Sequence, residues 1–265
     1  MIHNMKQKDI PERGNMNHKI DRGVGFLILG LAFVAMIFET GNAVYTWSQQ
    51  AGRTKSYTIV IDPGHGGNDP GKIGINNVPE KDVNLAISLD LKEILEQNDC
   101  RVIMTRDHDR GLYQEGDSNK KVADLHARCQ IINDSDADAV ISIHQNSFTS
   151  ESSKGAQVFY QTTSVEGKVL AEILQEQLVT GLDPDNRRVA KANSDYYMLK
   201  HTQAPMVIVE CGFLSNTQEA ELLTQEAYQR RVAWTVALGV LQYVSGGHNQ
   251  NEYNSANDRS GELSG

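Results

Sequence analysis

Apolar residues follow two different spacings between residues 57 and 244. Short runs of β-branched and aliphatic residues, typical of buried strands, alternate with longer segments in which apolar positions recur every three or four residues, as in helices. Strands are expected at residues 57–62, 100–106, 138–144, 155–161 and 206–211. Helices are expected at residues 82–97, 118–133, 165–180 and, as one or two helices, 217–244. In the last segment we expect Trp234, Val240 and Leu241 to point inward.

This alternation of strands and helices predicts an α/β fold, in which a mostly parallel, twisted sheet carries helices on both faces. The chain of 265 residues is long enough for one medium domain with appendages, and we find no internal repeat in it. We expect a single folded domain at residues 57–245, after a polar linker at 44–56. The tail at 246–265 is rich in asparagine, serine and glycine and is expected to be disordered.

The first 43 residues differ from the rest of the chain. A leader with scattered basic residues precedes the uncharged segment 23–38, which is longer than a signal-peptide core of about 7–15 residues and shorter than a membrane span of about 20. Gly41 and Ala43 form a small-x-small pair suited to signal-peptide cleavage. We predict a signal peptide or an N-terminal membrane anchor at residues 1–43, and either would export the domain. A buried core helix is the alternative, which the basic flank disfavours.

Composition argues against several classes of protein. The formal net charge of −9 is unsuited to a general nucleic-acid binder, which needs lysine and arginine to neutralise phosphates. A hydrophobic content of 39% is too low for a multi-span membrane protein. Cys100, Cys129 and Cys211 show no CxxC spacing, so we expect small buried side chains rather than a zinc ribbon or a disulfide framework.

Side chains able to bind metal or move protons stand where the expected strands end. His65 follows the first strand in the glycine-rich turn IVIDPGHGGNDPG, His144 ends the third strand, and Glu210 lies near the end of the last. Glu80 stands where the first long helix begins. Because the carboxyl ends of parallel strands meet at one edge of a sheet, we expect these four side chains to converge.

Two imidazoles and two carboxylates at one sheet edge are the side chains of a metal hydrolase. A catalytic zinc takes three protein ligands, of which two histidines and a glutamate are one known set, and a further carboxylate then moves protons. Each residue alone has a structural alternative: Glu80 favours the helix dipole, and His65 occupies a tight turn. A buried carboxylate without a partner is costly, which favours a role for Glu210. The pattern does not say which glutamate binds the metal.

At these residues the sequence resembles the zinc-dependent N-acetylmuramoyl-L-alanine amidases of the amidase-3 type. Seven stretches match in order over residues 57–244, essentially the whole folded region. They are IDPGHGGNDPG, PEKDVNL, VIMTR, LHARCQIIN, AVISIHQNS, GAQVFY and MVIVECGFLSN. The departures are small: Gln145 stands where alanine is common, and QIIN replaces a frequent Ala-Asn.

The resemblance implies a single catalytic domain with one Zn²⁺ per chain, bound by His65, Glu80 and His144. It makes Glu210 the catalytic carboxylate and places Asn146 near the site. The implied reaction is hydrolysis of the amide between N-acetylmuramic acid and L-alanine in peptidoglycan. The short leader and the lack of wall-binding repeats are most similar to the germination-specific subgroup, which acts on spore cortex together with a muramic-acid deacetylase to form muramic-δ-lactam. A vegetative autolysin has the same layout.

Two other functions stay open at this point. A zinc peptidase that cuts wall stem peptides would use the same side chains, and an exported wall-binding protein would keep the fold without activity. The expected partner is peptidoglycan, with no nucleic acid, in the cell wall or spore cortex outside the cytoplasm. Membrane contact is expected only through residues 23–38. The sequence leaves open whether the leader is cleaved, the oligomeric state and any activating partner or inhibitor.

Overall fold

The computed structural model describes residues 56–246. The predicted leader, nearly all of the predicted linker and nearly all of the predicted tail lie outside the described residues, so these boundaries remain predictions. Among the helices of residues 56–246, none combines the length and the apolar character needed to cross a membrane.

Six strands form one sheet in the order β2-β1-β3-β6-β4-β5. Their bounds are β1 Thr58–Pro63, β2 Arg101–Met104, β3 Ala139–Asn146, β4 Gln157–Gln161, β5 Lys191–Asn193 and β6 Met206–Phe213. The neighbours β2, β1, β3 and β6 run parallel, β4 is antiparallel to β6, and β5 is parallel to β4. The mostly parallel sheet confirms the sequence prediction. The sequence analysis missed β5, because three residues are too few to show the period of a strand.

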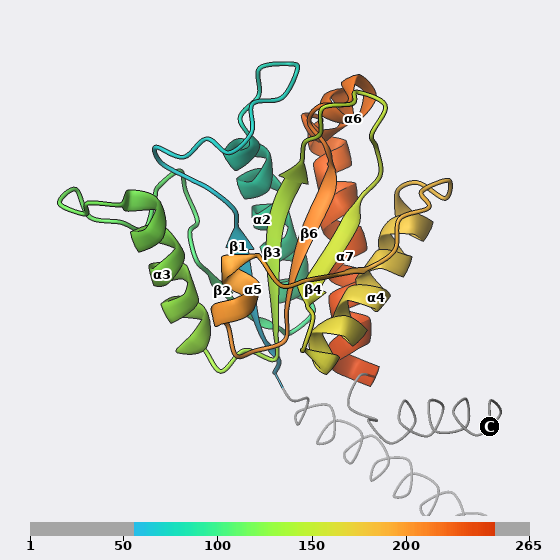
Figure 1. Ribbon diagram of the computed structural model, residues 1–265. Helices are drawn as coiled ribbons and strands as arrows, with labels where there is room; N and C mark the ends of the chain where they lie inside the picture. Colours follow the sequence, from blue (N-terminus) through green and yellow to red (C-terminus); the bar gives the residue numbers. More distant parts are fainter. Residues whose placement is uncertain (1–55, 247–265) are drawn as a thin grey trace, which may run out of the picture. The chain divides into compact units, whose positions relative to one another are not determined.

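Helices cover both faces of the sheet, as predicted (Figure 1). One face carries α2 (Glu80–Gln97), α4 (Val165–Gly181) and α7 (Glu226–Gly246), and the other carries α3 (Lys120–Asn133) and the short α5 (Tyr197–His201). The remaining helix, α6 (Thr217–Leu223), follows β6. Because side chains alternate along a strand, Ile59 and Ile61 pack into the first core and Val60 into the second.

The prediction that Trp234 points inward is wrong. Trp234 is 52% exposed, and Leu238, one turn further along α7, is 42% exposed. The helix packs on the core through a different stripe, which includes the fully buried Val236 and Val240. Since only one stripe of a helix can face the core, apolar residues on the opposite side stay in solvent. Val240 is buried as predicted, and Leu241 is partly buried against the same core.

The three cysteines are buried and free, which confirms the prediction. Cys100 and Cys211 belong to the core under α2, α4 and α7, and Cys129 belongs to the core under α3 and α5. Burial raises the pKa of all three thiols, so they remain protonated and behave as small apolar side chains.

Candidate metal centre

His65 lies in the turn that follows β1. Its φ of +62° is in the left-handed region, which residues other than glycine seldom adopt. The turn brings the imidazole back beside the end of the strand. There Nδ1 pairs with Asp69 Oδ2 at 2.9 Å, while Nε2 lies 3.2 Å from Oε2 of Glu80. Asp69 therefore orients the ring so that Nε2 is the nitrogen presented to Glu80.

Glu80 is the first residue of α2 and is only 2% exposed. Its Oε1 lies 3.0 Å from Nδ1 of His144, and the backbone N–H groups of Lys72 and Gln145 donate to the carboxylate at 2.9 and 3.1 Å. Burial by itself would raise the pKa of Glu80. The hydrogen bonds and charges of His144 and His65 outweigh burial and hold this pKa well below its usual range. Glu80 is therefore an ionised carboxylate.

His144 and Glu210 lie opposite each other on the neighbouring strands β3 and β6. The register of β3 and β6 pairs them directly. The imidazole of His144 lies against the backbone of Gly64, where an added Cβ would be 2.2 Å from its Cε1. Any larger residue at position 64 would displace the ring. The rings of His65 and His144 meet edge to face, with centroids 5.0 Å apart.

The structure brings the predicted site residues together at one edge of the sheet. His65, Glu80 and His144 each offer one ligand atom, and these atoms lie within 4.8 Å of one another. All three, together with Glu210 and Asn146, line a cavity of about 510 Å³. Two imidazole nitrogens and one carboxylate oxygen form a donor set that zinc accepts, and the cavity leaves an open side for a further ligand. The residues present thus fit a zinc ion.

The environment of Glu210 differs from that of Glu80. Glu210 is 8% exposed, and its Oε2 has no hydrogen-bond partner among the described residues. Burial raises the pKa of Glu210 to about 7, with a smaller opposing effect from His144. A carboxyl group that titrates near neutral pH can both accept and return a proton. Two glutamates whose environments push their pKa values apart are suited to two different tasks.

A buried amide network supports Glu80 from behind. Asn84 Nδ2 donates to the carbonyl of Gly64 at 3.1 Å and lies 3.4 Å from Glu80 Oε1, and Gln145 Nε2 donates to Asn84 Oδ1 at 3.2 Å. The acceptor role of Oδ1 turns the amide nitrogen of Asn84 toward Glu80. Asn146 lines the cavity, and its own Oδ1 accepts from the following backbone N–H.

Arg128 holds the turn that carries His65, a role that the sequence analysis missed. This arginine is 2% exposed, and it donates to the carbonyls of Pro63 at 2.7 Å and His65 at 2.6 Å. It also pairs with Asp62 at 2.7 Å and with Asp124 at 2.6 Å. The available signal was its position on the apolar face of the predicted helix, where a charged residue needs a buried partner.

The second buried arginine, Arg106, follows β2. Its Nε donates to the carbonyl of Pro63 at 2.9 Å, and its Nη2 donates to the carbonyl of Gly64 at 3.0 Å. The backbone between β1 and His65 is therefore held by guanidinium groups from both sides. Helical or strand periodicity treats an arginine as a surface residue, and this is why both were missed.

We expect Asp62 to make the stability of the protein depend on acid pH. Burial would raise its pKa, but Arg128, Thr105 and Ser142 outweigh this effect and lower the pKa of Asp62 from 3.8 to about 2. A depressed folded-state pKa contributes stability above pH 4, and this contribution is lost as the pH falls to 2. The loss is about 2 kcal/mol of the free energy of unfolding. Urea unfolding between pH 7 and pH 2 measures it.

The control for this prediction is the exposed Asp185. Asp185→Asn should retain the wild-type dependence of the free energy of unfolding on pH. In Asp62→Asn the acid-dependent part of this free energy should shrink by about 2 kcal/mol. This variant should also be less stable at pH 7, because the buried charge of Arg128 then has one partner fewer. Equal acid dependence in wild type and Asp62→Asn would contradict the assignment.

Comparison with known proteins gives consistent matches. A family model described as N-acetylmuramoyl-L-alanine amidase (Amidase_3) matches residues 59–242. The germination-specific N-acetylmuramoyl-L-alanine amidase of Bacillus subtilis (strain 168) is 36% identical over 225 residues, which cover 84% of this chain and 92% of that relative. The amidase LytC of the same strain is 33% identical over 222 residues, covering 82% of this chain and 42% of LytC.

Solved structures agree with the fold. The CwlD amidase from Clostridioides difficile, solved in complex with the GerS lipoprotein, is 41% identical with a TM-score of 0.70, covering 72% of this chain and 99% of that one. An N-acetylmuramoyl-L-alanine amidase from Clostridium difficile 630 is 31% identical with a TM-score of 0.64, covering 73% of this chain and 99% of that one.

Proposed function

This chain belongs to the N-acetylmuramoyl-L-alanine amidase family, and from this premise we propose that it acts through a zinc ion held by His65, Glu80 and His144. It is a peptidoglycan amidase, which separates N-acetylmuramic acid from the L-alanine of the stem peptide. The observation that carries the zinc proposal is the convergence of three ligand atoms within 4.8 Å, beside the buried carboxylate of Glu210.

Hydrogen bonds within the chain orient two of the three proposed ligands. His65 is oriented by Asp69, and Glu80 accepts backbone hydrogen bonds from two separate segments of the chain. When bound in such a site, zinc polarises a carbonyl group and lowers the pKa of a water molecule toward about 7. Partners of this kind fix the orientation of a ligand and commonly contribute 10–100-fold to metal affinity.

Glu210 moves the proton in the proposed reaction. Its carboxylate accepts a proton from water as the water oxygen adds to the carbonyl carbon of the scissile amide. The carboxyl group then gives this proton to the alanine nitrogen as the C–N bond breaks, which leaves a lactyl carboxylic acid and a free L-alanine amine. A pKa of about 7 and the position of Glu210 on the wall of the cavity with the proposed ligands support both transfers.

Spore cortex is the proposed substrate within peptidoglycan. The germination-specific relative matches over 92% of its length, whereas LytC matches over 42% of its length. In this proposal the enzyme strips stem peptides from the muramic acid of the cortex, and a muramic-acid deacetylase then helps to form muramic-δ-lactam, in sporulation and germination. Because peptidoglycan lies outside the cytoplasmic membrane, we also propose export through a signal peptide or anchor at residues 1–43.

Digestion of purified peptidoglycan by the full chain tests these proposals. We expect stem peptides with a free L-alanine amine and intact glycan strands, identified by mass. A chelator should abolish these products and added zinc should restore them. Cortex peptidoglycan should be digested faster than vegetative peptidoglycan from the same organism.

Other products would support the alternatives. Fragments cut within the stem peptide would identify a zinc peptidase. Binding to the wall without products, at full zinc loading and on both kinds of peptidoglycan, would identify a non-catalytic wall-binding protein. Faster digestion of vegetative peptidoglycan would overturn the cortex proposal and leave the amidase assignment intact.

A further inference from the structure

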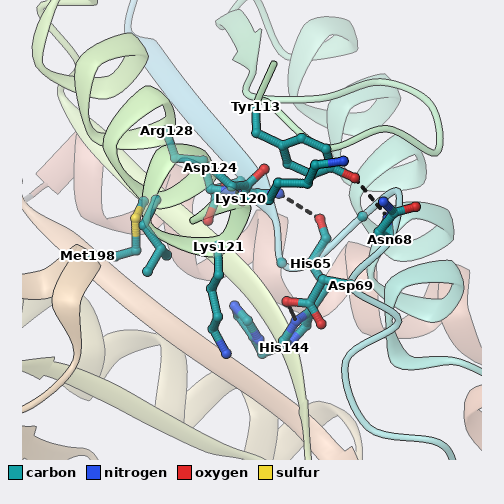
Figure 2. Close-up of a pocket in the computed structure, with 14 residues that line it drawn as sticks. His65, Asn68, Asp69, Tyr113, Lys120, Lys121, Asp124, Arg128, His144 and Met198 are labelled. Carbon is teal, nitrogen blue, oxygen red and sulfur yellow. Dashed lines mark hydrogen bonds and ion pairs between the residues drawn. The ribbon is translucent and has the colours of Figure 1, made fainter. Parts of the chain in front are cut away.

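A second cavity, of about 350 Å³, lies beside the candidate metal centre, between the turn that carries His65 and the start of α3 (Figure 2). We call it the α3 cavity. The two cavities adjoin, because they share six lining residues. The shared residues are His65, Asp69, Lys121, Leu125, His144 and Met198. The α3 cavity is therefore within reach of a substrate whose scissile bond lies beside His144 and Glu210.

The carboxylates that line the α3 cavity already have partners. Asp62 and Asp124 both pair with Arg128, and Asp69 pairs with His65. Arg128 in turn uses its remaining donors on backbone carbonyls. These groups hold the turn and the helix together, so each carboxylate of the α3 cavity already has a side-chain partner.

The two lysines of the α3 cavity differ from these groups. The side-chain ammonium groups of Lys120 and Lys121 form no hydrogen bond or ion pair with any other residue between 56 and 246. The ammonium of Lys120 lies 5.1 Å from the centroid of the Tyr113 ring, and Lys121 is near enough to Asp69 for their charges to interact. In Figure 2, Lys121 extends toward His144, whereas Lys120 turns toward Tyr113. Both ammonium groups are therefore free to donate hydrogen bonds to a ligand.

Stabilisation of α3 does not explain these lysines. Both stand in its first turn, where the unpaired backbone N–H groups disfavour a cation, and this turn contains no acidic residue. The pair therefore weakens the helix it belongs to. An anion bound in the α3 cavity would attract both lysines and offset their unfavourable interaction with the start of the helix.

We propose that the α3 cavity binds the stem peptide of the substrate, with Lys121 and Lys120 contacting its carboxylates. The proposal rests on the amidase function. Amide formation neutralises the lactyl carboxyl of muramic acid, so the disaccharide on one side of the scissile bond carries no charge. The peptide on the other side ends in a free carboxylate. Lys121 borders both cavities and lies nearer the L-alanine, and Lys120 lies further along the peptide.

Synthetic muramyl peptides test this subsite in the full-length, zinc-loaded protein. One substrate keeps its free carboxylates, and its partner carries them all as amides. We expect wild type to prefer the free carboxylates by about 10-fold or more in kcat/KM. The double variant Lys120→Gln/Lys121→Gln should lose this preference, mainly through KM, and should cleave the amidated substrate as wild type does. Lys92→Gln, which lies outside both cavities, is the matched control.

Calorimetry gives a readout that is independent of turnover. Free stem peptide should bind to the chelator-treated wild type and to Lys92→Gln, and about 10-fold or more weakly to the double variant. Equal binding by all three proteins, or an equal loss of activity on both substrates, would overturn the subsite. If wild type cleaves neither substrate, the amidase function fails while calorimetry still decides whether the lysines bind the peptide.

The melting temperature of the double variant should not fall, because its helix loses an unfavourable charge pair.

Discussion

Glu210→Gln is expected to lower kcat by about 10³-fold while the protein keeps one zinc per chain. Glutamine has the shape of glutamate but cannot accept the proton of the attacking water. The substitution does not touch His65, Glu80 or His144, so zinc binding should persist. Stability should not fall, because burial raises the pKa of Glu210 to about 7 and a neutral amide avoids the cost of burying a charge. Turnover on muramyl peptides, elemental analysis and thermal unfolding together measure these three effects.

The matched control for this variant is Glu221→Gln, which makes the same chemical change at an exposed position on α6. It should retain wild-type turnover. Substantial turnover in Glu210→Gln would remove Glu210 from the mechanism. Loss of zinc from Glu210→Gln would instead make this residue a ligand and reverse the roles proposed for the two glutamates.

His144→Ala is expected to abolish both zinc binding and activity. The substitution removes one of the three proposed ligands and leaves empty space against Gly64, where no other side chain replaces the imidazole. The loss of a ligand should exceed the 10–100-fold effect of losing a supporting partner, so we expect zinc affinity to fall by more than about 100-fold. Competition with a chromophoric chelator measures the affinity, and peptidoglycan digestion measures the activity.

His108→Ala is the appropriate comparison, because His108 is exposed and lies outside both cavities. It should bind zinc and digest peptidoglycan like wild type. A His144→Ala protein that stayed fully loaded with zinc would refute the assignment of His144 as a ligand. Retained zinc without activity would place His144 next to the metal in a different role.

The fold class and most elements could be predicted because their signals are local. Three of the parallel strands, β1, β3 and β6, are mostly apolar because helices bury them on both sides, and this pattern identifies them without any knowledge of their partners. The predicted helices have an apolar face that is readable at a spacing of three or four residues. The elements that were missed, β5 and α5, are three and five residues long, too short for such a period.

The side chains that support the site could not be predicted in the same way. Arg128 lies 63 residues from the carbonyl of His65 that it holds, and Arg106 lies 42 residues from the carbonyl of Gly64. Nothing local in the chain links such distant positions. For Trp234 the error was the opposite one, since an exposed apolar residue was predicted to be buried. An apolar residue in a helix does not by itself show which stripe of the helix the neighbouring elements cover.

The sequence by itself determined the α/β fold and the residues that end its strands, because strand and helix periods and the alignment of parallel strands depend on short stretches of chain. Only the tertiary structure decided how two chemically identical glutamates differ. Glu80 lies between two imidazoles that keep it ionised. Glu210 is buried, one of its oxygens has no partner within residues 56–246, and its pKa rises to about 7. The physical reason is that a carboxyl pKa depends on burial and on nearby charges, and only folding sets these.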